Sequence, residues 1–279
     1  MKLEVWTQYG PLNSEPIFKA FIKSLQDAGD TVILNRESDA DVAVIWSVLW
    51  LGRMRNYKKI WQRYRQANKP VIVLEVGGLR RNKSFKVAIN GVNRKADFAN
   101  QNVDDTRWPL FQHTLKPWQQ RGQTIIVLGQ HNASEQWVGM PDMRRWFESQ
   151  VQQIRKHTDR PIVVRGHPGD KHAPKYLKSK DWQVSTAPSL TQDLLNAHCT
   201  ITYNSSPSVA SAIEGIPTYV TDPNPKISQA YAVANTDLST IETPQTFERQ
   251  EWIEKLAMCH WNFDELSSGE AWAHMRDYV

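Results

Sequence analysis

The sequence predicts an α/β protein built from two doubly wound domains, and three observations support that prediction. Short apolar runs alternate with amphipathic stretches, which is typical of βαβ units with parallel sheets. The alternation stops between residues 96 and 123 and then begins again. The chain has 279 residues, enough for two domains of about 100–150 residues each.

The first half predicts a sheet with its helices. A helix is expected over 15–28, where Ile17, Phe21 and Leu25 share one face. A turn at Gly10-Pro11 precedes it, and a second helix is expected over 54–66. The apolar runs between and after these helices predict parallel strands at 3–6, 31–34, 42–46, 71–75 and 85–89.

The second half repeats this architecture after a linker that contains Pro109 and Pro117. Its strands are expected at 124–128, 161–165, 200–203 and 217–220, and its helices at 143–157, 190–197 and 206–214. We therefore assign residues 1–110 and 111–245 to the two domains, with a helical tail over 246–279 packing back on them. Ligands of such folds bind at loops that follow the strands, so we expect a central cleft lined by both sheets.

Composition excludes several classes of protein. With 40% hydrophobic and 23% charged residues the chain is not disordered, and no apolar run approaches the roughly 20 residues of a membrane helix. Two cysteines, Cys199 and Cys259, cannot form a disulfide framework or a cysteine-rich zinc site. The first residues lack the apolar region of a secretory signal, so we expect a cytoplasmic protein.

Positive charge is concentrated in one segment. Between Arg53 and Lys95 there are thirteen Lys and Arg residues and one acid, Glu75, so this segment carries +12 while the whole chain carries +5. Such asymmetry indicates either a site for a polyanion or a solvated basic helix. The aromatic residues Tyr57, Trp61 and Tyr64 lie among these cations and either stack on bases or belong to the core.

Three motifs follow expected strands of the second half. After the strand at 200–203, Asn204, Ser205 and Ser206 open a helix, where they either bind a phosphate or cap the helix. Glu214 lies near the other end of that helix, and its carboxylate can accept hydrogen bonds from a ribose. The strand at 161–165 leads through Arg165 to His167-Pro168, where guanidinium and imidazole can both contact phosphate.

The third motif ends the strand at 124–128. Gly129 allows close approach of a ligand to the backbone, and Gln130 offers an amide for polar groups. His172 lies near His167, but no accompanying carboxylate pattern indicates a metal site.

Together and in this order, the three motifs resemble the nucleotide-sugar-binding half of GT-B glycosyltransferases, in particular the capsule polysaccharide synthesis group with its Kdo-transferase-like enzymes. The resemblance covers about residues 124–220. It implies a GT-B-like α/β fold, two Rossmann-like domains facing a central cleft, with the donor bound by Gly129, Gln130, Arg165, His167, Asn204, Ser205, Ser206 and Glu214. It also implies that no metal and no tightly bound cofactor is required, and the sequence has no Asp-x-Asp motif beyond the approximate Asp104-Asp105.

The first half contains a further match to the same group. Glu75, Gly77, Leu79 and Arg80, followed by 91–93, fit its Glu-x-Gly-x-Leu-Arg and Gly-Val-Asn segments. Glu75 ends an expected strand, so its carboxylate is the candidate base that deprotonates an acceptor hydroxyl. The structural alternative is that Glu75 pairs with Arg80 or Arg81 and holds the loop.

The acceptor is predicted from charge. A basic acceptor domain resembles the phage enzymes that glycosylate hydroxymethylated pyrimidines in DNA, so the leading hypothesis is a monomeric enzyme that transfers a sugar from a UDP-glucose-like donor to such a base, which requires base flipping. The alternatives are a capsule or lipopolysaccharide glycosyltransferase using CMP-Kdo or another sugar nucleotide, and a DNA-binding module without catalysis. Expected acceptor contacts are Arg53, Arg55, Lys58, Lys59, Arg80, Arg81 and Lys83. Trp46 and Trp50 are a possible platform for a sugar or base.

Overall fold

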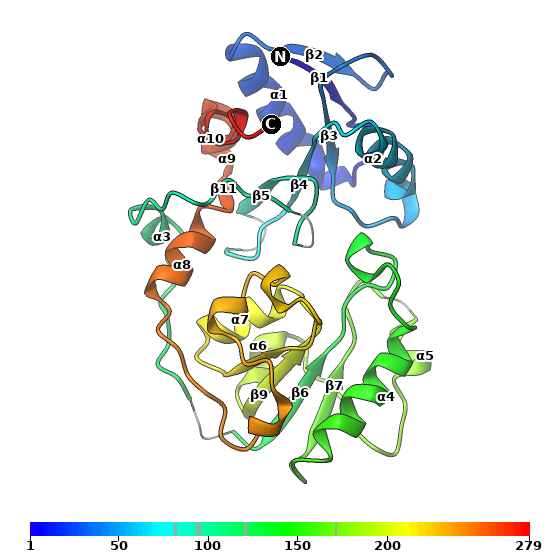
Figure 1. The fold of residues 1–279 in the computed structure, drawn as a ribbon, viewed down its shortest axis with the longest axis vertical. Helices are drawn as coiled ribbons and strands as arrows, with labels where there is room; N and C mark the ends of the chain where they lie inside the picture. The colour runs from blue at the N-terminus through cyan, green and yellow to red at the C-terminus, as the bar shows by residue number, and fades with distance from the viewer. Residues whose placement is uncertain (81–82, 94–95, 120–121, 171) are drawn as a thin grey trace. The chain divides into compact units, whose positions relative to one another are not determined.

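The computed structural model describes residues 1–80, 83–93, 96–119, 122–170 and 172–279, which form two compact units (Figure 1). Unit 1 contains Met1–His113, Ala133–Gln136 and Ile253–Val279, and unit 2 contains Thr114–Asn132 and Trp137–Trp252. Unit 1 is therefore discontinuous in sequence. The sequence-based boundary at 110 lies close to His113, and most of the expected tail belongs to unit 1.

The sheet of unit 1 has the strand order β11-β5-β4-β3-β1-β2. Strands β1 to β4 pair in parallel, whereas β5 is antiparallel to both β4 and β11. The expectation of a wholly parallel sheet is thus wrong here, because the seven residues between β4 and β5 are too few for a crossover to a parallel strand. The strands are β1 (Lys2–Val5), β2 (Thr31–Leu34), β3 (Val42–Trp46), β4 (Val71–Val76), β5 (Ser84–Ile89) and β11 (His260–Asn262).

The tail expected to be helical contributes a strand to this sheet. In β11, Trp261 pairs with Phe85 of β5 and is buried. Three residues are too short for a recognisable strand pattern, so sequence periodicity did not predict β11. Helices α9 (Phe263–Ser268) and α10 (Glu270–Arg276) follow and pack on α1, where the Phe21 and Trp272 rings meet edge to face at 5.9 Å.

The remaining helices of unit 1 are close to those expected. Helix α1 covers Glu15–Asp27 and buries Ile17, Phe21 and Leu25, as its periodicity predicts. The expected helix over 54–66 is divided into a 3-10 turn, η2, and α2. The elements are η1 (Leu12–Ser14), η2 (Gly52–Asn56), α2 (Tyr57–Gln66) and α3 (Arg107–Leu110), while α8 (Gln250–Ala257) crosses the boundary between the units.

Unit 2 is a doubly wound parallel sheet with the order β10-β9-β6-β7-β8. Its first strand in sequence, β6, is central, so the strand order reverses there, and ligands of open α/β sheets bind beside such a reversal. The strands are β6 (Thr124–Leu128), β7 (Ile162–Arg165), β8 (Gln183–Val184), β9 (Ala197–Thr202) and β10 (Thr218–Val220).

Short helices connect these strands. The Asp142 side chain caps α4 by accepting a hydrogen bond from the Arg145 N–H at 3.1 Å. The sequence did not predict α5 or β8, and β9 begins at Ala197 instead of 200. The helices are α4 (Met143–Ile154), α5 (Ala173–Tyr176), α6 (Leu190–Leu194) and α7 (Pro207–Ile213), with 3-10 turns η4 (Pro225–Ile227), η5 (Tyr231–Val233) and η6 (Leu238–Thr240). The 3-10 turn η3 (Glu135–Trp137) includes residues of both units.

Helix length also bears on membranes. Across the described residues, every helix is too short or too polar to pass through a lipid bilayer.

Candidate functional site

The carboxyl edge of the unit 2 sheet brings together three of the sequence motifs. Thr202 of β9, Leu128 of β6 and Arg165 of β7 lie on one row of paired residues at the ends of their strands. The loops with Gln130 and His167 leave from this row, as does the turn after β9 that leads to Asn204. Because β6 is the point of reversal in the strand order, this edge is where the fold predicts a ligand.

Three side-chain oxygens near this edge lack a protein partner. Within the described part of the chain, Gln130 Oε1, Thr202 Oγ1 and Ser205 Oγ are buried and accept or donate no hydrogen bond. Gln130 is only 7% exposed and Thr202 is fully buried. An unpaired buried polar group costs about 1–3 kcal/mol, so a cluster of them at one sheet edge indicates partners supplied by something other than the protein.

His167 is partly exposed and has a fixed orientation. Its Nδ1 accepts a hydrogen bond from the Gly169 N–H at 3.0 Å. Its ring meets the His131 ring edge to face, with centroids 5.4 Å apart. Sequence reasoning missed His131 and Thr202 as site residues. For His131, its place directly after Gly129 and Gln130, at the end of the strand over 124–128, was an available signal.

Two predicted donor ligands also form hydrogen bonds within the protein. Asn204 Nδ2 donates to Asp222 Oδ2 at 2.7 Å. The Arg165 guanidinium forms an ion pair with Asp193 at 2.6 Å and donates to the Ala187 carbonyl at 2.9 Å. These side chains fix the loops around the edge, and sequence alone gave no sign of Asp193 or Asp222 as their partners.

Glu214 is not brought to this edge. Helix α7 runs from the carboxyl edge back across the sheet, so Glu214 at its far end lies toward the amino-terminal edge, where it forms an ion pair with Lys116. A direct ribose contact from Glu214 beside Asn204 is therefore not supported by the topology of the unit.

The start of α7 also differs from the expected phosphate cradle. Pro207 at the first position of the helix has no N–H, and the N–H groups of Ser208 and Val209 donate to the Ser205 and Ser206 carbonyls. The exposed Ser206 side chain makes no capping hydrogen bond. The simple capping interpretation of Ser206 is thus wrong, and the helix terminus offers fewer donors than its sequence suggests.

Gly129 is required for packing. A Cβ at this position would lie 2.8 Å from the Phe147 ring and 3.4 Å from Met143 Sδ. These side chains occupy the space that the sequence interpretation assigned to a ligand.

In unit 1, Glu75 is the penultimate residue of β4. Its Oε1 accepts the Val76 N–H at 2.8 Å, and its neighbour across the sheet is Lys86 of β5. Lys86 is only 4% exposed, and burial lowers its pKa although Cys259 and Glu75 oppose that shift. A buried cation beside Glu75 therefore comes from the neighbouring strand, which sequence spacing did not predict.

A pocket of about 540 Å³ lies at the same end of the unit 1 sheet. It combines two predicted acceptor residues, Arg80 and Lys83, with the Asn13 and Asn262 amides. Apolar side chains such as Phe85 form the rest of its wall. With two cations against the one carboxylate of Asp264, the pocket is suited to an anionic group attached to a partly apolar body. Its full lining is Asn13, Pro16, Ile17, Arg80, Lys83, Ser84, Phe85, Leu110, Phe111, Asn262, Phe263 and Asp264.

The loop beside this pocket is fixed by the C-terminal segment. His260 Nε2 accepts the Gly78 N–H at 3.1 Å, and His260 Nδ1 donates to the Leu256 carbonyl at 2.9 Å. Arg107 forms a buried ion pair with Glu265 at 2.6 Å and stacks on the Trp261 ring. Arg81, another predicted acceptor contact, lies outside the described residues.

The basic segment around α2 has two distinct faces. Its predicted acceptor cations are exposed, whereas Tyr57, Trp61 and Tyr64 are buried in the core of unit 1, as are Trp46 and Trp50. The prediction that bases stack on these rings and the prediction of a tryptophan platform are therefore both wrong. The amphipathic helix α2 directs its aromatic face into the sheet. The exposed cations are Arg53, Arg55, Lys58 and Lys59.

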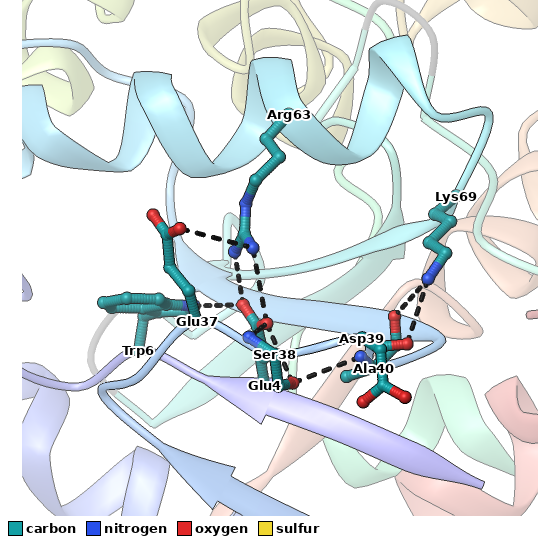
Figure 2. Close-up of polar contacts among 8 residues, drawn as sticks. All are labelled: Glu4, Trp6, Glu37, Ser38, Asp39, Ala40, Arg63 and Lys69. Carbon is teal, nitrogen blue, oxygen red and sulfur yellow. Dashed lines mark hydrogen bonds and ion pairs between the residues drawn. The ribbon is translucent and has the colours of Figure 1, made fainter.

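Arg63, from the same helix, turns toward the sheet and pairs with the fully buried Glu4 (Figure 2). Glu4 also accepts hydrogen bonds from Trp6 Nε1 at 3.1 Å and from Ser38 Oγ at 2.9 Å. Burial raises the pKa of the Glu4 carboxyl, but the hydrogen bond from Arg63, together with those from Trp6 and Ser38, outweighs burial and holds that pKa below its ordinary value. Part of the positive charge of the segment thus stabilises the fold.

The described residues contain no group of three or more His, Cys, Asp or Glu side chains arranged to hold a metal ion.

Comparisons with known proteins show the fold. No family model and no curated protein sequence matches the chain. Two solved structures from Thermosulfurimonas dismutans are similar over nearly the whole chain. The KpsC beta Kdo 2,7 transferase has a TM-score of 0.57 at 14% identity, covering 99% of this chain and 100% of that one. The KpsC beta Kdo 2,4 transferase has a TM-score of 0.56 at 13% identity, covering 93% and 90%. The chain therefore has a GT-B-like α/β fold with two Rossmann-like domains.

Proposed function

We propose that the protein is a glycosyltransferase that takes its sugar from a nucleotide-sugar donor bound at the carboxyl edge of the unit 2 sheet. The observation that carries this proposal is the set of unpaired buried oxygens of Gln130, Thr202 and Ser205 beside the reversal in strand order. A nucleoside diphosphate or monophosphate with its sugar supplies hydroxyl and phosphate groups that can form hydrogen bonds with these three oxygens. The similarity in fold to two Kdo transferases supports the same class.

In this proposal the residues of unit 2 have different roles. Gln130, Ser205 and His167 contact the donor, and His167 stabilises the negative charge on the leaving phosphate. Asn204 and Arg165 position the loops through Asp222 and Asp193.

Glu75 of unit 1 acts as the general base in the proposed reaction. It removes the proton of an acceptor hydroxyl, whose oxygen forms a bond to the anomeric carbon of the sugar. The bond from that carbon to the phosphate oxygen breaks, and its electron pair leaves with the nucleotide. The buried Lys86 of β5 is the cross-strand neighbour of this base.

For the acceptor we propose an anionic glycan. Arg80 and Lys83 in the unit 1 pocket provide positive charge, and the amides of Asn13 and Asn262 suit sugar hydroxyls. CMP-Kdo is the first donor to test, because the two similar solved structures are Kdo transferases.

A hydroxymethylated base in DNA, with a UDP-glucose-like donor, is the second candidate acceptor. The exposed cations Arg53, Arg55, Lys58 and Lys59 favour it, since they can neutralise phosphates. The burial of the neighbouring aromatic rings weighs against it, because single bases then lack a stacking surface on α2.

The test combines donors, acceptors and a matched pair of variants. Purified protein is incubated with CMP-Kdo or UDP-glucose and with either Kdo-terminated oligosaccharide or hydroxymethylcytosine DNA, and the products are weighed by mass spectrometry. We expect a mass gain of one Kdo on the oligosaccharide. A gain of one hexose on DNA would establish the second candidate, and unchanged acceptors with every donor would refute the proposed activity.

Two threonines of β9 provide the control. Thr202 has an unpaired Oγ1, whereas Thr200 Oγ1, two residues earlier, donates to Thr218 at 3.0 Å. Thr202→Val should weaken CMP or UDP binding about tenfold, the equivalent of one lost hydrogen bond, with no loss of stability. Thr200→Val should lower stability by about 1 kcal/mol and leave nucleotide binding unchanged. Equal nucleotide affinity in both variants would argue against a donor at this edge.

A further inference from the structure

Two imidazoles meet at the carboxyl edge of unit 2, and the sequence motifs assign a role to only one of them, His167. His167 follows β7, and His131 follows β6, the neighbouring strand. Their rings lie edge to face at 64°, with centroids 5.4 Å apart. His131 is 9% exposed, whereas His167 is partly exposed and can reach a ligand.

Gly169 connects the two rings. Its N–H donates to His167 Nδ1 at 3.0 Å, and the His131 ring hydrogen-bonds to the Gly169 backbone. The turn is closed by the Asp170 N–H, which donates to the His167 carbonyl at 2.9 Å. A Cβ on residue 169 would lie only 3.1 Å from His167 Nδ1, so a side chain there requires the imidazole to move by a few tenths of an ångström.

These contacts determine where the His167 proton resides. A neutral imidazole has one N–H and one acceptor nitrogen. Because Nδ1 accepts from Gly169, the hydrogen of the neutral ring is on Nε2, which becomes the donor available to a ligand. The bond between His131 and the backbone of Gly169 limits how this turn can rotate.

We propose that His131 is a positioning residue that acts through Gly169 to hold His167 in the Nε2–H tautomer, directed at a phosphate oxygen of the donor. This inference rests on the proposed function for the identity of the ligand. The tautomer itself does not depend on that function. No motif of the sequence assigns a role to His131.

The charges around His131 are consistent with a neutral ring. Burial lowers the pKa of His131, against the opposing effects of the Asp170 carboxylate and the Gly169 hydrogen bond. Burial raises the pKa of Asp170, but hydrogen bonds from the Tyr176 hydroxyl and the His172 N–H outweigh burial and lower it. Asp170 is therefore ionised at neutral pH, and neutral His131 can serve as a hydrogen-bond donor.

The experiment follows the ring nitrogens of His167 directly. The full-length protein is labelled with ¹⁵N-histidine, and the His167 signals are assigned as those that disappear in His167→Gln. In the wild type we expect His167 Nδ1 at the shift of an unprotonated nitrogen and Nε2 at that of a protonated one. In His131→Phe, which keeps the ring but removes its N–H, both shifts should move toward tautomer-averaged values.

Conservative and control variants separate positioning from folding. His131→Gln and His131→Asn each retain an N–H donor, and at least one should restore the wild-type shifts. His157→Phe replaces an exposed histidine elsewhere in unit 2 and should leave them unchanged. If His131→Phe does not fold, Gly169→Ala tests the same contact, because its methyl group displaces Nδ1 and should also release the tautomer.

Activity provides the second measurement. With the donor that supports transfer, His131→Phe should lower kcat about tenfold while KM for the acceptor stays constant, and the amide variants should recover part of kcat. Unchanged His167 shifts in both His131→Phe and Gly169→Ala would overturn the positioning role. If the shifts respond as expected but no donor supports transfer, the proposed function fails and the positioning role stands.

Discussion

The buried imidazole of His260 makes the stability of unit 1 depend on pH. Burial, with a contribution from the nearby Lys86 ammonium, lowers the pKa of His260 from 6.5 to about 3. As pH falls below 6.5 the unfolded chain binds a proton at this residue and the folded chain does not, so stability is lost from pH 6.5 down to about 3. Between pH 7 and pH 5 this residue lowers the free energy of unfolding by about 2 kcal/mol.

Native-state hydrogen exchange of the β5 amides measures this loss. The free energy of opening is determined at pH 7 and pH 5 for the wild type and for His260→Gln, whose amide can still accept from Gly78 and donate to Leu256. The wild type should lose about 2 kcal/mol more than the variant. Comparing the two proteins removes the contributions of all other titrating groups. An equal loss in both would show that His260 is protonated in the folded state and would refute this account of its burial.

Two further predictions concern packing and charge. Arg63→Ala should lower the free energy of unfolding of unit 1 by about 3 kcal/mol, because the buried Glu4 carboxylate loses its cation. The control, Arg55→Ala, removes an exposed cation and should change that free energy by less than about 0.5 kcal/mol. Urea unfolding compares the two variants, and similar midpoints would contradict the role of the ion pair. Gly129→Ala should lower the free energy of unfolding by about 1–3 kcal/mol, since the added methyl group would lie 2.8 Å from the Phe147 ring. An unchanged melting temperature would show that the ring moves freely.

Much of the fold could be predicted because its signals are local. The periodicity of α1 and the alternation of apolar runs are encoded within short windows of sequence, and the structure has most of the expected strands. A topological rule predicted that three motif residues lie at one sheet edge, because the carboxyl ends of parallel strands lie together. These residues are Gln130, His167 and Asn204.

The errors came from contacts between residues far apart in sequence. The partners of Arg165 and Asn204 are 28 and 18 residues away, so sequence could identify the side chains but not what they bind. Aromatic residues among cations in α2 could belong to either face until the helix was placed on its sheet. For Glu214, motif spacing was misleading, because the direction of α7 takes the residue away from the edge.

The discontinuity of unit 1 has a consequence for synthesis on the ribosome. Strand β5 emerges with only one of its two neighbours, because β11 is translated after all of unit 2. Until then the nascent chain exposes an unpaired strand edge that can pair with another chain. Arg107 also lacks its ion-pair partner, because Glu265 has not yet been synthesised. Ribosomal stalling late in the message should therefore yield a chain with unit 2 formed and unit 1 prone to aggregate.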